Sequence, residues 1–156
     1  MKRIASFTVD HTKLGKGLYV SRIDGDIVTY DIRMKVPNGG DYGSPSELHT
    51  FEHLFATYVR NSKYDGSIIY VGPMGCRTGF YLLTRDDMTK EDTLNLIKES
   101  FDFIRTFKGE IPGAKIEECG NYLDHDLKGA KALATDMLNV LKDWSKEKMD
   151  YKYWIK

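Results

Sequence analysis

The distribution of apolar and polar residues along this chain predicts three strands and three helices. Residues 27–36 alternate and are rich in β-branched and aromatic types, which is typical of a half-buried strand. Two further strands are predicted at residues 66–72 and 78–84, and a turn containing glycine and proline joins them. Amphipathic helices are predicted over residues 45–60, 89–107 and 127–144.

The first predicted helix has a clear N-terminal signal. Ser44 is placed as the N-cap, Pro45 occupies the first helical position, and Glu47 completes a capping box. The helix is expected to run to about Arg60. Its apolar residues recur at helical spacing and define one buried stripe, formed by Leu48, Phe51, Leu54, Phe55, Tyr58 and Val59.

The order of these elements indicates the fold class. Strands and helices do not alternate strictly, which favours an α+β fold, with an antiparallel sheet covered by helices, over a doubly wound sheet. Residues 1–156 fit a single compact domain, and a domain of this size buries about 68–70% of the surface that its unfolded chain exposes. The chain therefore needs no metal or disulfide merely to fold.

Charge and hydropathy restrict the partners and the compartment. Lys plus Arg and Asp plus Glu number 23 each, so no net field favours nucleic acid or an anionic membrane. The N-terminus has no apolar run like that of a signal peptide, and no other stretch approaches a membrane span. We expect a cytoplasmic protein with no nucleic-acid or membrane partner, in which the thiols of Cys76 and Cys119 stay free.

His49 and His53 are four residues apart on the helix predicted over residues 45–60. Their imidazoles project from one helix face and can bind a single ion. Glu52 lies on nearly the same face, and a carboxylate beside the histidine pair suits metal-assisted acid–base chemistry. The alternative is a pair of polar residues on a solvated face, and the neighbouring glutamate favours the metal site.

The same segment has the HxxEH spacing of the inverted zincins, so a small metallopeptidase is the first alternative function. A peptidase normally takes a downstream carboxylate as third ligand and needs a cleft that so short a chain has difficulty building. Cys119 is the better third ligand, since a thiolate and two imidazoles leave a fourth position open, although a lone cysteine is more often a buried apolar residue. The second alternative is a non-catalytic metal-binding module with a closed four-ligand site.

Cys76 lies in a turn between Gly75 and Gly79, where glycine permits a close approach of a ligand. The neighbouring Arg77, or a cation brought near by folding, would favour the thiolate and make Cys76 usable as a base. The alternative is a small packed residue.

Three further polar residues are expected at ordinary positions. His11 is either a surface residue or a substrate donor. His125, flanked by two aspartates, is expected to be solvated or to cap a helix. Arg33, on an alternating strand, is expected to face solvent.

Taken together, the motifs resemble the S-ribosylhomocysteine lyase family, LuxS, over nearly the whole chain. They occur in the family's order and spacing, which is far more specific than HxxEH alone. The resemblance is carried by Ser6 to His11, Asp31 to Arg33, His49 to His53, Pro73 to Cys76 with Thr78 to Tyr81, and Cys119 to Gly120 with His125 to Leu127 and Gly129 to Lys131. Tyr70 and Arg77 depart from the residues of some relatives, which concerns contacts to the substrate and not the reaction.

The resemblance implies an α+β homodimer with two shared active sites at its interface. It implies an Fe²⁺ ion, replaceable by Zn²⁺ or Co²⁺, on His49, His53 and Cys119. It also implies cleavage of S-ribosylhomocysteine to homocysteine and 4,5-dihydroxy-2,3-pentanedione, the precursor of the autoinducer-2 quorum-sensing signal.

The resemblance further implies roles for residues that are not metal ligands. Cys76 and Glu52 match the family's catalytic acid–base residues. Ser6, His11 and Arg33 match residues that hold the ribose, and they are expected to come from the partner chain. The matching arginine also favours the thiolate of the catalytic cysteine.

Overall fold

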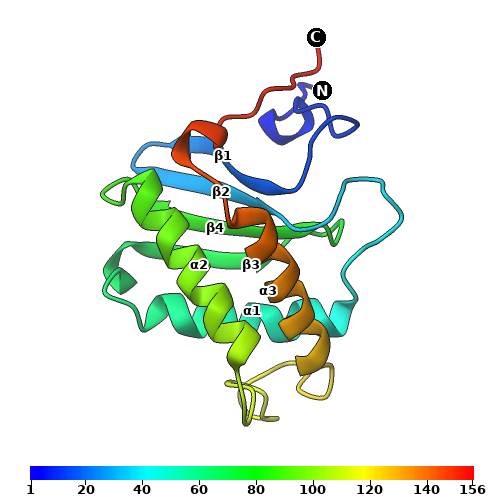
Figure 1. The fold of residues 1–156 in the computed structure, drawn as a ribbon, viewed down its shortest axis with the longest axis vertical. Coiled ribbons are helices and arrows are strands. Elements are labelled where there is room, and N and C mark those ends of the chain that lie inside the picture. Colours follow the sequence, from blue (N-terminus) through cyan, green and yellow to red (C-terminus); the bar gives the residue numbers. More distant parts are fainter.

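The computed structural model describes residues 1–156 and shows one antiparallel sheet packed with three helices (Figure 1). The sheet has the order β1-β2-β4-β3 and consists of β1 (Gly17–Asp24), β2 (Ile27–Arg33), β3 (Ile68–Pro73) and β4 (Gly79–Arg85). The helices are α1 (Pro45–Arg60), α2 (Lys90–Thr106) and α3 (Leu127–Leu141). Short 3-10 turns occupy Ala5–Phe7, Asp65–Ser67 and Lys146–Lys148. The predicted α+β class is confirmed.

The two faces of the sheet have different environments. Tyr30 and Ile32 of β2 belong to the core shared with the helices. Because side chains alternate along a strand, Asp31 and Arg33 point to the opposite face. Beyond β1 on the sheet edge, the two terminal segments lie side by side (Figure 1), joined by an antiparallel bridge between Val9 and Trp154.

The start of α1 is as predicted. Ser44 Oγ accepts a hydrogen bond from the Glu47 backbone N–H at 3.2 Å, and the Ser44 N–H donates to Glu47 Oε1 at 2.8 Å. At the other end, the Arg60 guanidinium donates to the carbonyls of Ile68 and Ile69 at 2.8 and 2.9 Å. The helix that carries the histidine pair is therefore fixed at both ends, by its own cap and by β3.

Two elements end three residues before their predicted ends, and one strand was not predicted. The strand expected over residues 27–36 ends at Arg33, because the N–H groups of Met34 and Lys35 both donate to the Thr78 carbonyl. The helix expected to reach residue 144 ends at Leu141, and the Trp144 indole donates to the Leu18 carbonyl. The unpredicted β1 pairs with β2 across a two-residue turn that begins at Gly25, whose φ of 61° suits glycine.

The core between helices and sheet centres on fully buried phenylalanines. The Phe51 ring lies 5.0 Å from the ring of Phe80 and 5.0 Å from that of Phe101, while Phe55 lies 5.2 Å from Phe101. These separations fall within the favourable range for aromatic pairs. The cluster holds α1 between β4 and α2, so the position of the histidine pair depends on it.

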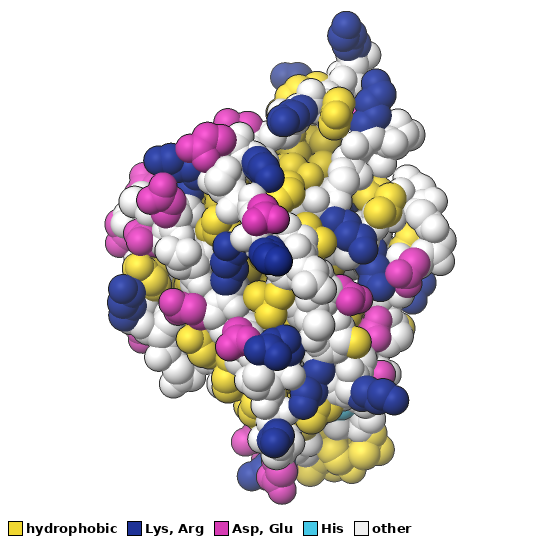
Figure 2. Space-filling model, in the orientation of Figure 1, with side chains coloured by type: hydrophobic (Ala, Val, Ile, Leu, Met, Phe, Trp, Pro, Cys, Tyr) yellow, Lys and Arg dark blue, Asp and Glu magenta, His cyan; other side chains and the backbone are white.

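At the surface, Lys and Arg side chains are interspersed with Asp and Glu over the face shown in Figure 2. None of the helices combines the length and the apolar character that crossing a lipid bilayer requires.

Replacing Phe51 with alanine is predicted to lower the free energy of unfolding by about 3–5 kcal/mol, because it leaves a cavity among packed rings. Urea denaturation measures this loss. Ile116→Ala is the control: the Ile116 side chain is 71% exposed, so its loss should cost at most about 0.5 kcal/mol. A loss at Phe51 as small as that of the control would contradict the packing described.

Candidate functional site

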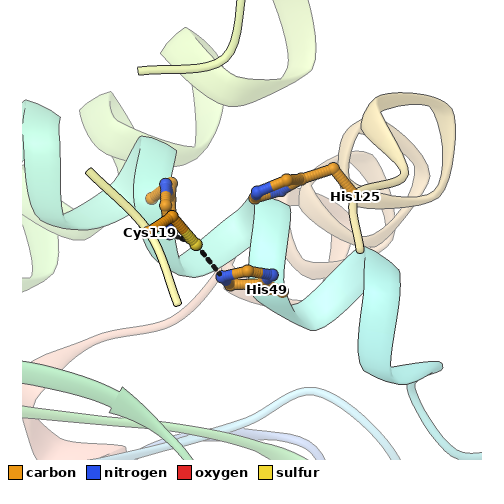
Figure 3. A group of neighbouring side chains, drawn as sticks. His49, Cys119 and His125 are labelled. Carbon is orange, nitrogen blue, oxygen red and sulfur yellow. Dashed lines mark hydrogen bonds between the residues drawn. The ribbon is translucent and has the colours of Figure 1, made fainter. Parts of the chain in front are cut away.

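His49, His53 and Cys119 bring three metal-binding atoms together. The Cys119 sulfur lies 3.4 Å from His49 Nε2 and 4.0 Å from His53 Nε2. Donors at about 2.0–2.3 Å from a shared ion in a tetrahedral arrangement are separated by about 3.6 Å, so the observed distances suit one ion. Figure 3 shows Cys119 on its loop facing His49 on α1.

Backbone carbonyls orient both histidine rings. His49 Nδ1 lies 2.8 Å from the Asp124 carbonyl oxygen, and His53 Nδ1 lies 2.7 Å from the Pro112 carbonyl oxygen. A carbonyl can only accept, so each Nδ1 carries the proton and each Nε2 presents its lone pair to the site. Such outer hydrogen bonds are typical of metal-binding histidines.

Cys119 is held by its own loop. Its N–H donates to the Lys115 carbonyl, and the Asn121 N–H approaches its sulfur at 3.4 Å. The loop approaches α1 closely at Gly113, whose φ is +72° and where an added Cβ would lie 3.1 Å from His53 Nδ1. Glycine therefore lets the loop place its carbonyl against His53.

His125 also belongs to the site, which corrects the expectation of a solvated or capping residue. One ligand atom from each of His49, His53, Cys119 and His125 lies within 4.8 Å of the others. Asp126, the next residue, is the N-cap of α3. The sequence signals for His125 were its place in the family motif and its position before this cap, on the loop that carries Cys119.

The His125 ring lies nearly parallel to the His49 ring and does not converge with it. It stacks on His49 with centroids 4.1 Å apart and planes at 19°, as Figure 3 shows. Its Nδ1 lies 2.9 Å from Thr50 Oγ1, and its Nε2 is the one buried side-chain nitrogen or oxygen without a hydrogen-bond partner. Burial, followed by the proximity of His49 and His53, lowers the pKa of His125, which favours the neutral imidazole that metal binding needs.

The residues present fit a metal ion. The set combines a thiol with imidazoles, it is oriented from behind by carbonyls, and it contains an unpartnered buried nitrogen. Because an imidazole binds a metal in the plane of its ring, the stacked His125 does not aim at the same point as His49. His49, His53 and Cys119 converge as they stand, and His125 would have to rotate to join them.

Cys76 lies in the turn between β3 and β4, beside a second group of residues. Its sulfur is 3.0 Å from Thr78 Oγ1 and 4.0 Å from Arg33 Nη1. The Arg33 side chain is 3% exposed and paired with Asp31 at 2.7 Å, so the expectation that it faces solvent is wrong. Burial acts to lower the pKa of Arg33, but Asp31 outweighs it and raises that pKa.

The contact between Arg33 and Cys76 lies within one chain. The resemblance places Arg33, with Ser6 and His11, on the partner chain, and the contact puts Cys76 beside the Arg33 of its own chain. If an active site is shared between two chains, Arg33 and Cys76 belong to the same chain's contribution.

The other predicted site residues, Glu52, Ser6 and His11, lie in different places in the chain's structure. Glu52 lines a cavity of about 260 Å³ with His49 and Gly75. Ser6 lines one of about 370 Å³ on the other side of the sheet, with Tyr70 among its neighbours. The His11 ring nitrogen Nδ1 lies 2.8 Å from the Val9 carbonyl. One chain therefore does not gather Ser6, His11 and Arg33 around the metal-binding group.

The largest of the surface cavities, about 630 Å³, opens beside the metal-binding group. His125 and Tyr122 line it together with Gly113 of the same loop. Of the metal-binding group, only His125 borders this cavity.

Comparison with known proteins identifies the family. Residues 4–148 match the S-ribosylhomocysteinase (LuxS) family. The chain is 47% identical to an S-ribosylhomocysteine lyase of Clostridium acetobutylicum, with 97% of this chain and 99% of the relative covered. It is 46% identical to the corresponding lyase of Finegoldia magna, covering 97% and 99%, and 48% identical to that of Phocaeicola vulgatus, covering 97% and 98%. The histidine pair, the loop cysteine and the match over almost the full length agree: this chain belongs to the LuxS family of S-ribosylhomocysteinases.

Proposed function

We propose that this protein cleaves S-ribosylhomocysteine to homocysteine and 4,5-dihydroxy-2,3-pentanedione. The observation that carries the proposal is the convergence of His49, His53 and Cys119, with both imidazoles oriented by loop carbonyls. The similar proteins of three bacteria bear the name of this lyase. The five-carbon product is the precursor of the autoinducer-2 signal, so the proposed reaction supplies that signal.

The resident metal is proposed to be Fe²⁺, with Zn²⁺ or Co²⁺ able to replace it. His49, His53 and Cys119 would hold it, and a mixed thiolate and imidazole set accepts all three ions. When bound, such an ion acts as a Lewis acid and makes the carbon next to a carbonyl easier to deprotonate.

Glu52 and Cys76 are the proposed acid–base pair. Each takes a proton from one carbon of the sugar and returns it to a neighbouring oxygen or carbon, so the carbonyl moves along the ribose. Once the carbonyl is β to the thioether, loss of one more proton expels the homocysteine sulfur, which leaves as a thiol. The sequence consumes no oxidant or reductant, since electrons only shift within the sugar.

Thr78 and Arg33 support Cys76 in this role. Arg33 Nη1 donates to Thr78 Oγ1 at 2.7 Å, so the Thr78 hydroxyl proton is available to the Cys76 sulfur. A cation and a hydroxyl donor both favour the thiolate, which is the form that accepts a proton.

The active site is proposed to be shared between two chains of a homodimer. Glu52 and the metal-binding group lie on α1 and the loop packed on it, whereas Arg33 lies on the sheet face that the helices leave uncovered, with Cys76 in the turn beside it. Ser6 lines a cavity on that second face as well. A second chain packed there would bring the ribose-holding residues Ser6, His11 and Arg33, together with Cys76, to the partner's metal.

The first prediction from this function is release of free thiol from S-ribosylhomocysteine by protein that holds about one divalent ion per chain. Fe²⁺-loaded protein should lose activity in air, and Co²⁺- or Zn²⁺-loaded protein should keep it longer.

Cys119→Ala should lose both metal and activity. A thiol-reactive dye and elemental analysis of the same sample measure the two quantities, and casein serves as the alternative substrate. Cleavage of casein without thiol release would show a metallopeptidase instead.

A second prediction separates bases from ligands. Glu52→Gln and Cys76→Ala should each retain the metal while turnover falls by about 10²–10⁴-fold, the usual contribution of one acid–base residue. Metal content and kcat are measured on each variant. Wild-type turnover in either variant would remove that residue from the mechanism, and loss of metal in both would show that they are ligands.

A third prediction concerns the shared site. Mixtures of Glu52→Gln with Arg33→Ala, or with Cys76→Ala, should recover up to about a quarter of wild-type activity, since half the dimers are mixed and each has one intact site. Mixing Cys76→Ala with Arg33→Ala should recover none, because these residues enter a site together. Native mass spectrometry confirms subunit exchange. If exchange occurs and the first two mixtures stay inactive, each chain completes its own pocket.

A further inference from the structure

The C-terminal segment contacts the residues behind Cys76. The hydroxyl of Tyr151 donates to Asp31 Oδ2 at 2.5 Å, and the same oxygen accepts from Arg33 Nη2 at 2.7 Å. Asp31 is fully buried, and its other oxygen accepts from Arg33 Nε at 3.1 Å. A line of contacts therefore runs from the tail through a buried ion pair to the Cys76 sulfur.

Several contacts hold the tail against the sheet. The Val20 N–H donates to the Met149 carbonyl at 2.7 Å, which ties the tail to β1. The Tyr151 ring stacks on Tyr19 at 5.2 Å and meets the edge of Trp154 at 5.6 Å. Figure 1 shows this segment passing β1 towards the N-terminus. The position of the Tyr151 hydroxyl is thus set by ring packing and not by its hydrogen bond alone.

The Tyr151 hydroxyl is a permanent donor. Burial, followed by the charge of Asp31, raises the pKa of Tyr151 far above its usual value, so the phenol keeps its proton. Its hydrogen bond partly neutralises the negative charge of Asp31, which therefore attracts Arg33 less strongly than an otherwise unpaired carboxylate would. It also fixes the carboxylate plane, which determines where the planar guanidinium points.

We propose that Tyr151 is a positioning residue of the active site: its hydroxyl holds Asp31 so that Arg33 directs Nη1 and its positive charge at Thr78 and Cys76. The proposal rests on the proposed role of Cys76 as a base. Tyr151 touches neither Cys76 nor the metal-binding group, and it acts only through Asp31 and Arg33.

The test measures the reactivity of the Cys76 thiol directly. Metal-loaded protein is treated with iodoacetamide at pH 7, and mass spectrometry of the two cysteine peptides follows Cys76 separately from Cys119. Tyr151→Phe keeps the ring and removes the hydroxyl. The Cys76 alkylation rate should fall by about three- to tenfold, because the thiolate is the reactive form.

Tyr153→Phe is the matched control. Tyr153 lies two residues away in the same tail and is 46% exposed. This variant should alkylate at the wild-type rate. An equal slowing in both variants would indicate a general disturbance of the tail and would overturn the proposal.

A double variant tests the route through Arg33. In an Arg33→Gln background, adding Tyr151→Phe should not change the alkylation rate further, because the positive charge through which Tyr151 acts is already absent. A further fall of the same size would overturn the proposal. Wild-type reactivity of Cys76 in Tyr151→Phe alone would also overturn it.

Asp31→Asn tests the same contacts if Tyr151→Phe does not fold. An amide cannot accept from Arg33 through two oxygens as the carboxylate does. Arg33 should then no longer direct Nη1 at Thr78 and Cys76, so Cys76 should alkylate more slowly than in the wild type, and an unchanged or faster rate would overturn the proposal. These measurements need no lyase turnover. Failure to release thiol from S-ribosylhomocysteine would refute the proposed function. The alkylation rates would still decide whether Tyr151 acts on Cys76.

Discussion

The metal-binding group depends on the hydrogen bonds that fasten the loop between α2 and α3 to α1. The imidazoles of His49 and His53 donate from Nδ1 to carbonyls of that loop, at Asp124 and Pro112. The same loop carries Cys119 to the Nε2 side of both rings. One set of contacts therefore positions the loop, selects the tautomer of each ring and completes the donor set. A loop that lifted from α1 would lose the cysteine and the ring orientations together.

The two faces of the sheet support different groups of residues. Its first face forms the core with the helices and thereby fixes α1 and the histidine pair. Its second face carries the buried pair of Asp31 and Arg33, with Cys76 at the nearby turn. A buried ion pair is costly unless its remaining hydrogen-bonding capacity is satisfied. Here Tyr151 and Thr78 satisfy it from opposite sides, which joins the C-terminal tail to the turn that carries Cys76.

His125 and Arg33 show where reasoning from sequence failed. Both are polar residues in contexts that usually face solvent, one between two aspartates and one on an alternating strand. His125 is instead stacked on His49, and Arg33 is buried against Asp31. Periodicity reports which face of an element a residue occupies, but it does not report what another segment places on that face. The terminal segment covering Asp31 and the loop packed on α1 are both distant in sequence.

The sequence by itself determined the local features of this protein. The capping box and apolar stripe specify α1 to the residue, the spacing of His49 and His53 specifies a metal-binding face, and the motifs specify the family. The first two depend on neighbours within a few positions, and the third depends on the order and spacing of short motifs; a sequence displays both directly. Only the tertiary structure decided that His125 lies beside the other donor atoms, that Arg33 and Cys76 of one chain are in contact, and that Tyr151 lies behind them. Each of these contacts joins segments more than 40 residues apart, and their meeting is set by the packing of the whole domain.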